Sequence, residues 1–259
     1  MAITTDLVRR IRAGEPVVGS WFTVPHPMAA ETLARGGFDF LLLDGEHAPV
    51  PPDALAGLLP ATELQGCPVI YRPRTNSVDL IRGALDAGVT GVMVPMIETE
   101  SQARAAIGAA KYPPLGRRGI GPWRASNYYD DYPGYVVTAN EATGLVLQIE
   151  SKEAVEAIDG IASLPGVDVL YVGPADMAGS MGLKPGEKHE ALTAAIGRVA
   201  AAAKKHGKAL GIDVTALDFL AGYREMGFSF FTYGIDTSYL MDGARAASQA
   251  FRARLDAKR

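Results

Sequence analysis

Short runs of β-branched and other apolar residues alternate along the chain with longer segments in which apolar positions recur at helical spacing. The short runs predict eight strands, at residues 17–24, 38–44, 68–72, 91–97, 144–150, 167–172, 208–214 and 228–235. The longer segments predict helices, among them 27–35, 77–87, 100–111, 152–163, 189–206 and 216–226. Several of these helices are followed by glycine, the residue that most often terminates a helix.

Eight strands that alternate with helices over a chain of 259 residues are typical of a (β/α)8 TIM barrel. A doubly wound open sheet is the alternative, but no Gly-x-Gly-x-x-Gly follows the first predicted strand. No linker rich in Ser, Gly or Pro divides the sequence. We therefore predict an α/β fold with a single barrel domain over residues 1–259.

Residues 112–143 interrupt the alternation. They show no sustained period and are rich in Gly, Pro, Arg and Tyr. A long irregular segment in a compact domain is usually a lid or an interface. Because this one comes after the fourth predicted strand, we expect it on the C-terminal face of the barrel, where barrel enzymes carry their active sites.

Composition narrows the class of protein. Hydrophobic residues make up 48% and charged residues 21%, which is typical of a globular chain. A net charge of −4, without a Lys/Arg cluster, argues against a nucleic-acid partner. The longest apolar run, 38–43, is too short to cross a membrane, and the N-terminus lacks a signal-peptide pattern. The single cysteine, Cys67, excludes an internal disulfide and favours the reducing cytoplasm.

Acidic residues follow two neighbouring predicted strands. In the fifth, Gln148 and Glu150 share a face with Val146, while Leu145, Leu147 and Ile149 point toward the helices. The sixth is followed closely by Asp176. Two carboxylates with an amide beside them suit a hard divalent ion such as Mg²⁺ or Mn²⁺. The alternative is that Glu150 and Asp176 merely cap the helices that follow them.

Base and cation candidates come from the second and third predicted strands. His47 lies in the acidic turn Asp44-Gly45-Glu46-His47 and is the best general-base candidate, with His26 a weaker rival. Arg72 ends the third strand, where an arginine can stabilise an anionic oxygen. The alternative for Arg72 is an ion pair with Asp44 or Glu46, and both roles can coexist.

Other chemistries find little support. Cys67 precedes the third strand on the stability face, so a thiol nucleophile is not expected. Few lysines lie near strand ends, so a Schiff-base mechanism lacks a nucleophile. The ends of the last two strands carry Asp213 and Asp236, where a barrel phosphate site would have glycine-rich turns, so phosphorylated substrates are disfavoured. Asp86 stands at a helix C-terminus, an unfavourable place for a carboxylate, and we expect it to have a partner.

Seven segments, in order, resemble the HpcH/HpaI aldolase family, and the resemblance continues in register from about residue 19 to residue 237. They are LLLDGEHAP (41–49), YRP (71–73), LDAG (85–88), VMVPMIET (92–99), YPPLGRRG (112–119), LQIES (147–151) and VGPAD (172–176). This family comprises metal-dependent class II pyruvate aldolases acting on 2-keto-3-deoxy sugar acids and 4-hydroxy-2-oxo-diacids. The resemblance implies reversible cleavage of a 4-hydroxy-2-oxo acid to pyruvate and an aldehyde.

The resemblance also assigns roles to residues at matching positions. It implies Glu150 and Asp176 as ligands of Mg²⁺ or Mn²⁺, with Co²⁺ a further candidate, and Gln148 near the substrate. Arg72 matches the arginine that stabilises the enolate, His47 the acid/base, and Asp86 the carboxylate that raises the basicity of that histidine. The remaining matched positions are pocket-lining or hold the pyruvate carboxylate: Trp21, Asp44, Gly173, Pro174 and Ala175. The family is typically a homohexamer, a trimer of dimers, with the last helix exchanged between subunits, which would involve residues 242–255.

The sequence departs from the family pattern after the last two strands. Many members are more apolar than this chain over residues 211–215, so we expect the pocket for the aldehyde to be unusual. The main alternative is another pyruvate-enolate enzyme, such as an oxaloacetate decarboxylase or a citrate-synthase-like condensing enzyme. A non-catalytic ligand-binding barrel is disfavoured, because Arg72, His47, Glu150 and Asp176 are all present.

Overall fold

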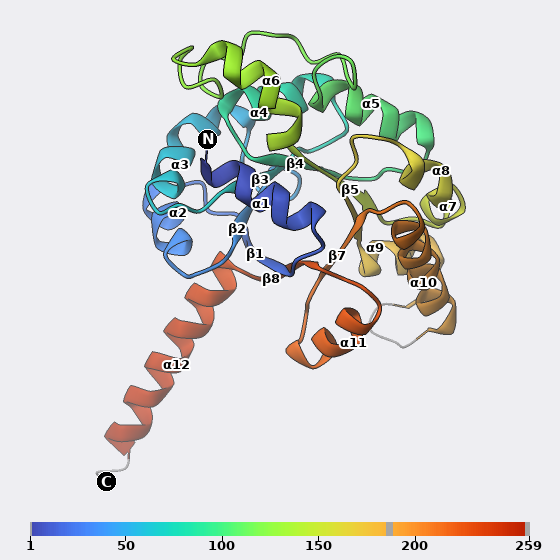
Figure 1. Ribbon diagram of the computed structural model, residues 1–259. Coiled ribbons are helices and arrows are strands. Elements are labelled where there is room, and N and C mark those ends of the chain that lie inside the picture. Colours follow the sequence, from blue (N-terminus) through green and yellow to red (C-terminus); the bar gives the residue numbers. More distant parts are fainter. Residues whose placement is uncertain (1, 185–188, 257–259) are drawn as a thin grey trace.

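Eight parallel strands close into a barrel at the centre of the protein in this computed structural model, which describes residues 2–184 and 189–256 (Figure 1). Strand order follows chain order, and β1 pairs with β8 to close the barrel. The strands are β1 (Val17–Phe22), β2 (Phe40–Asp44), β3 (Val69–Arg72), β4 (Gly91–Val94), β5 (Gly144–Ile149), β6 (Val169–Val172), β7 (Ala209–Asp213) and β8 (Phe230–Ile235). The predicted (β/α)8 barrel is confirmed.

Helices surround the barrel (Figure 1). They are α1 (Ala2–Arg12), α2 (Pro27–Ala34), α3 (Leu55–Glu63), α4 (Val78–Ala87), α5 (Glu100–Ala110), α6 (Tyr132–Ala142), α7 (Lys152–Glu156), α8 (Ile158–Ser163), α9 (Pro174–Ser180), α10 (Glu190–Lys205), α11 (Leu220–Glu225) and α12 (Asp236–Asp256), with 3-10 turns η1 (Pro52–Ala54) and η2 (Leu217–Phe219). The helix predicted at 152–163 is two helices, α7 and α8. The one predicted at 216–226 begins as η2 and continues as α11.

The strands separate two hydrophobic cores. Leu145, Leu147 and Ile149 of β5 face the helices, whereas Val146 faces the barrel interior, as the period of two predicts. Inside the barrel, large rings fill the space: Phe40 stacks on Phe230 with 4.8 Å between centroids, and Tyr171 packs edge-on against Phe230. Small residues in the strands leave room for these rings. The barrel interior is therefore filled by side chains and is not an open channel.

Helix α1, which the sequence analysis did not include among its helices, covers the N-terminal end of the barrel. Its Leu7 and Ile11 are buried in the same cluster as the interior residues of the strands. Arg12 of α1 pairs at 2.7 Å with Asp168, whose other oxygen accepts the amide of Leu145. One end of the barrel is thereby closed, and the loops at the other end carry most of the predicted site residues.

Residues 112–143 lie at the N-terminal end of the barrel, so the expectation that they cover the C-terminal face is wrong. The segment follows α5 and leads into β5, and a helix-to-strand connection lies on the N-terminal face of a (β/α)8 barrel. It is also not irregular throughout, because it contains α6, which packs on α1. Its Ala125 amide donates to the carbonyl of Asp86 at the end of α4.

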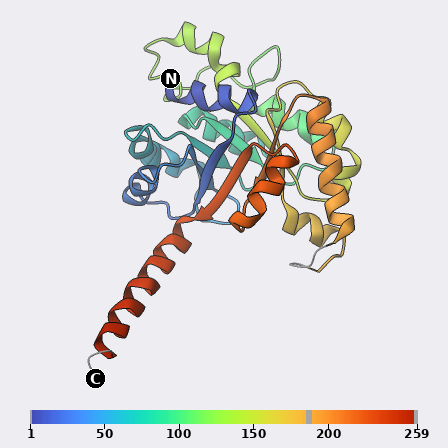
Figure 2. The ribbon, with the colours of Figure 1, turned by 60° about the horizontal axis from the view of Figure 1, so that its bottom comes forward.

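Helix α12 projects away from the barrel (Figure 2). It has 21 residues, and none of them is buried. Five large apolar side chains are exposed on it: Tyr239, Leu240, Met241, Phe251 and Leu255. Across residues 2–184 and 189–256, no helix combines the length and apolar character that a membrane crossing needs.

Candidate active site

Polar side chains from separate strands meet at the C-terminal end of the barrel. Because the strands are parallel, the residues that end them gather at one rim. The contributing residues are Trp21 from β1, Asp44 from β2, Arg72 from β3, Gln148 and Glu150 at the end of β5, Asp213 from β7 and Thr232 from β8. Asp176 stands in the first turn of α9, just beyond β6.

Arg72 is held as a rigid fork. Its Nε and Nη2 donate to the two carboxylate oxygens of Asp44 at 3.0 and 2.8 Å, and Nη1 lies 3.2 Å from Oε2 of Glu46. Arg72 is 7% exposed. Burial opposes ionisation of Asp44, but the hydrogen bonds and charge of Arg72 outweigh it and the pKa of Asp44 is lowered. The predicted ion pair with the acidic turn is therefore present, with both carboxylates.

The acidic turn after β2 folds around the same aspartate. Oδ1 of Asp44 accepts the backbone amides of Glu46 and His47 at 2.9 and 3.2 Å. Gly45 has no room for a Cβ, which would lie 2.8 Å from the carbonyl oxygen of Arg72. The backbone of His47 is thus fixed, while its imidazole is 72% exposed at the mouth of the barrel.

The sequence predicts Glu46 only as an alternative ion-pair partner of Arg72, and the structure places it within the site itself. Besides its contact with Arg72, its Oε2 lies 3.8 Å from Nε2 of His47. Burial raises its pKa most, with further contributions from Asp44 and Asp176, against the lowering effect of Arg72 and His47. The signal was the second carboxylate of the turn, two residues beyond the strand end.

Glu150 is buried at the end of β5 and does not cap a helix. Its Oε1 accepts Nε2 of Gln148 at 2.6 Å, and Oε2 accepts the Met96 amide at 3.3 Å. The cap of α7 is Ser151. Burial raises the pKa of Glu150 to about 7, helped by the charges of Asp176 and Glu46 and opposed by the Met96 amide and Arg72.

The turn after β6 lies against this buried carboxylate. A Cβ on Gly173 would be 2.6 Å from Oε1 of Glu150, so only glycine allows the approach. Gly173 is also the residue that precedes α9, with Pro174 at its first position and Ala175 next. Asp176 is therefore not the cap either, and its carboxylate is exposed beside Glu150 and Glu46.

These groups fit a divalent cation. Oε1 of Gln148 is buried without a hydrogen-bond partner, and the adjacent Glu150 carboxylate is desolvated among other acids. A cation would satisfy both. Within residues 2–184 and 189–256, no cluster of three or more His, Cys, Asp or Glu is arranged for a metal. Protein carboxylates would supply part of the coordination, with water or substrate in the remaining positions.

Trp21 connects the arginine to the opposite side of the mouth. The Arg72 guanidinium carbon lies 4.3 Å from the centroid of the Trp21 ring, and Nε1 of Trp21 donates to Oδ1 of Asp213 at 2.8 Å. The Thr232 hydroxyl donates to the same oxygen, and the Tyr171 hydroxyl lies 2.7 Å from that of Thr232. Asp213 is thus part of a connected polar wall formed by β1, β6, β7 and β8.

Residues 18–243 match the family model described as HpcH/HpaI aldolase/citrate lyase. The chain belongs to this family. It is 38% identical over 247 residues to a hydroxypyruvate/pyruvate aldolase of Pseudomonas aeruginosa, covering 94% of this chain and 91% of the relative. It is 35% identical over 244 residues to a 4-hydroxy-2-oxo-heptane-1,7-dioate aldolase of Salmonella arizonae, covering 94% and 93%.

A solved structure, an HpcH/HpaI aldolase/citrate lyase family protein from Burkholderia cenocepacia J2315, superposes with a TM-score of 0.88 at 36% identity. The match covers 96% of this chain and 99% of that one. The predicted family is confirmed, and the protein is a carbon–carbon lyase, as its aldolase relatives are.

One predicted residue of this HpcH/HpaI family member lies away from the others. Asp86 is in the last turn of α4, which runs from the C-terminal to the N-terminal end of the barrel. Within one chain, Asp86 and His47 therefore lie at opposite ends of the barrel. The partner of Asp86 is Arg118, whose Nε and Nη2 donate to Oδ1 at 3.1 and 2.7 Å. The expectation of a partner at this helix end is met by Arg118.

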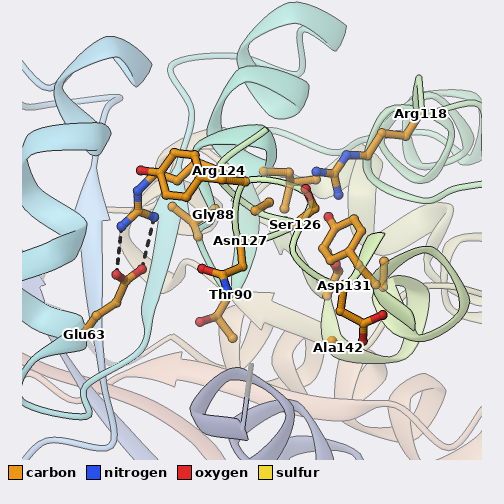
Figure 3. Close-up of a pocket in the computed structure, with 16 residues that line it drawn as sticks. Glu63, Gly88, Thr90, Arg118, Arg124, Ser126, Asn127, Asp131 and Ala142 are labelled. Carbon is orange, nitrogen blue, oxygen red and sulfur yellow. Dashed lines mark hydrogen bonds and ion pairs between the residues drawn. The ribbon is translucent and has the colours of Figure 1, made fainter. Parts of the chain in front are cut away.

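A pocket of about 430 Å³ opens beside this pair, between α4 and the 112–143 segment (Figure 3). Arg118 and Arg124 line it, and Arg124 pairs with Glu63 at 2.8 and 3.1 Å. None of the predicted site residues lines this pocket, which lies at the N-terminal end of the barrel. It is therefore separate from the mouth described above.

Two further sequence expectations concern His26 and Cys67. His26, the rival base, uses Nδ1 to accept the Met28 amide and caps α2. Cys67 is buried, and burial raises the pKa of its thiol to about 11, which makes it a poor nucleophile.

Proposed function

We propose that this family member cleaves a 4-hydroxy-2-oxo acid reversibly to pyruvate and an aldehyde, through a pyruvate enolate, with Mg²⁺ or Mn²⁺ as cofactor. The observation that carries the proposal is the buried Arg72 fork at the same rim as the desolvated pair Gln148 and Glu150. The names of the two aldolase relatives support pyruvate and 2-oxo acids as the substrate class.

The enolate is the species that this site has to stabilise. Arg72 is already fixed by Asp44, Glu46 and the Trp21 ring, so its charge needs no reorientation when negative charge develops on the substrate oxygen. A divalent ion held by Glu150 and Asp176 would supply Lewis-acid stabilisation of that charge. The turn at Gly173, Pro174 and Ala175 would hold the pyruvate carboxylate beside it.

His47 would exchange the proton of the 4-hydroxyl group. Its backbone is tied to Asp44, its imidazole is exposed toward the mouth, and a Glu46 carboxylate oxygen lies 3.8 Å from its Nε2. Within one chain, Asp86 lies at the opposite end of the barrel from His47. We therefore assign the action of Asp86 on His47 to a contact between subunits.

A homo-oligomer, a hexamer built as a trimer of dimers, is part of the proposal. Helix α12 exposes large apolar residues along its whole length and packs on the barrel only at its start, as expected of a helix exchanged between subunits. The buried, unpaired Cys67 is in keeping with a cytoplasmic enzyme.

A reaction panel tests the function. Purified protein is mixed with pyruvate, Mn²⁺ and a set of aldehydes, and separately with oxaloacetate alone. Aldol products with several aldehydes support the proposal, whereas turnover of oxaloacetate without any aldol product favours a decarboxylase. Asp176→Asn should abolish turnover and its stimulation by Mn²⁺, because a neutral ligand binds a hard cation weakly. Full activity in excess chelator contradicts the metal-dependent mechanism.

A further inference from the structure

The polar wall around Asp213 has a hydrogen-bond direction that the structure fixes. Thr232 donates its single hydroxyl hydrogen to Oδ1 of Asp213. The bond of 2.7 Å between the hydroxyls of Tyr171 and Thr232 must therefore have Tyr171 as its donor. The Trp21 indole, which can only donate, gives its hydrogen to the same aspartate oxygen at 2.8 Å.

The wall consequently has no donor left for a ligand. The hydrogens of Tyr171, Thr232 and Trp21 are all engaged within it, and they lead to Asp213. The remaining capacity is that of an acceptor: both bonds go to Oδ1, and Oδ2 accepts none that the structure records within its described residues. A ligand group facing this wall has to donate a hydrogen bond to be matched.

Asp213 points into the mouth. Leu210 and Ile212 of β7 pack in the core between strands and helices, so the alternate residues Gly211 and Asp213 face the interior. Asp213 is partly buried and lies at the end of its strand, within reach of a molecule in the mouth.

The charge of Asp213 is not neutralised by the nearby arginine. The Arg72 fork is taken up by Asp44 and Glu46 on the other side of the Trp21 ring. An aldehyde with a carboxylate at its far end would bring a second negative charge and an acceptor-only group to this wall. An aldehyde with a hydroxyl group would bring a donor and no charge.

We propose that Asp213 is a specificity-determining residue that selects neutral, hydroxylated aldehydes and rejects aldehydes whose far end is a carboxylate. The inference rests on the proposed aldolase function and names the aldehyde class of that same site.

The test compares two aldehydes in one enzyme. The ratio of kcat/KM for glyceraldehyde to kcat/KM for succinic semialdehyde is measured with pyruvate and Mn²⁺. In the wild type we expect a ratio of about ten or more, and in Asp213→Asn a ratio about tenfold lower, because like charges within one site are strongly disfavoured. Asparagine keeps an oxygen for Trp21 and Thr232. Asp218→Asn, which removes an exposed carboxylate from η2, is the control and should keep the wild-type ratio.

The outcomes separate the two proposals. If Asp213→Asn retains the wild-type ratio, even with both rates lowered, Asp213 only supports Trp21 and the inference is overturned. A wild-type preference for succinic semialdehyde overturns it as well. Exchange of the pyruvate methyl protons with D₂O, followed by NMR without any aldehyde, reports the enolate separately. No exchange in the wild type with Mn²⁺ overturns the proposed function, and the inference with it.

Discussion

The Arg72 guanidinium lies over the Trp21 ring, with its carbon 4.3 Å from the ring centroid, while Nε1 of the same indole donates to Asp213. The two carboxylates of the β2 turn hold the arginine from the other side. The cation that would face the enolate and the carboxylate that would face the aldehyde are therefore positioned by one aromatic side chain. Changes at Arg72 should reduce stabilisation of the enolate more than they disturb the polar wall around Asp213.

Replacement of Arg72 by lysine should remove most of the activity. Lysine keeps the charge but loses the planar fork that engages Asp44 and Glu46 together. Loss of a donor aimed at developing charge costs about 3–4 kcal/mol, or roughly 10²–10³ in rate. Exchange of the pyruvate methyl protons measures this directly. The exposed Arg74→Lys variant is the control, and a wild-type exchange rate in Arg72→Ala would show that Arg72 does not serve the enolate.

His47→Ala should separate two reactions. Aldol cleavage requires removal of a hydroxyl proton and should fall by about 10²–10⁴, the usual range for loss of a general base. Decarboxylation of oxaloacetate breaks its bond without that proton transfer and should fall much less. Both rates are measured on the same preparation, with His26→Ala as the matched control. Equal losses in the two reactions would assign His47 to the enolate or to the fold.

Mixing two impaired variants tests whether Asp86 serves His47 across subunits. Each chain of His47→Ala retains Asp86, and each chain of Asp86→Asn retains His47, at opposite ends of the barrel. If the pair forms between chains, unfolding and refolding the variants together should restore part of the activity of a mixed assembly. If the chains mix but no activity is restored, the role of Asp86 is limited to its ion pair with Arg118.

Glu150 should make the metal-free protein less stable as pH rises. Its pKa is about 7 in the fold against 4.5 for a free glutamate, so the unfolded chain loses this proton first. The contribution to stability is fully present below about pH 4.5 and is lost as pH rises toward 7. In chelator, Glu150→Gln should therefore exceed the wild type in unfolding free energy by about 3 kcal/mol at pH 8 and come close to it near pH 4.5.

Urea unfolding at pH 4.5, 6 and 8 measures this difference, with the exposed Glu153→Gln variant as control. Mn²⁺ at pH 8 should then stabilise the wild type more than Glu150→Gln, because a ligand that binds only the folded state stabilises it. A difference between wild type and variant that is the same at every pH would contradict the buried, proton-binding state of Glu150.

A charge on α12 should reduce the size of the assembly. Phe251 and Leu240 are 69% and 74% exposed in the single chain, and glutamate at either position would not disturb the barrel. We expect Phe251→Glu to lower the molar mass measured by light scattering, because a charge in a covered apolar contact is strongly unfavourable. Gln249→Glu, on the same helix, is the control. An unchanged mass for both apolar positions would exclude α12 from the interface.

The sequence was sufficient for the barrel because strand and helix signals are local. Glycines, β-branched runs and period-two alternation each depend on a few neighbouring residues, and β5 shows the predicted facing of every side chain. The 112–143 segment was misplaced for a different reason. Its position was inferred from the preceding strand, although the helix now seen as α5 intervenes and carries the chain back to the other end.

The sequence predicted which strand ends carry the residues of the candidate site. It did not predict most of the contacts that join those residues. Arg72 with Asp44 follows from two strands that pair in register, where Asp44 lies opposite Arg72. The contact between Trp21 and Asp213 joins residues 192 positions apart and depends on closure of the barrel through β8. Glu46 was expected only as an ion-pair partner of Arg72, because an acidic side chain in a turn is usually solvated and its burial depends on neighbours from other loops.

The one-way order of hydrogens from Tyr171 through Thr232 to Asp213 has a stereochemical consequence. Burial raises the pKa of Tyr171 well above its ordinary value, so the first group keeps its proton and the wall cannot deliver one to a substrate. A proton for the aldehyde oxygen must come from the opposite half of the mouth, where His47 stands. The carbonyl oxygen is then directed toward β2 and its hydroxylated carbon chain toward β7. The two prochiral faces of the aldehyde carbonyl are thereby distinguished, and one configuration should dominate at the new C4 centre.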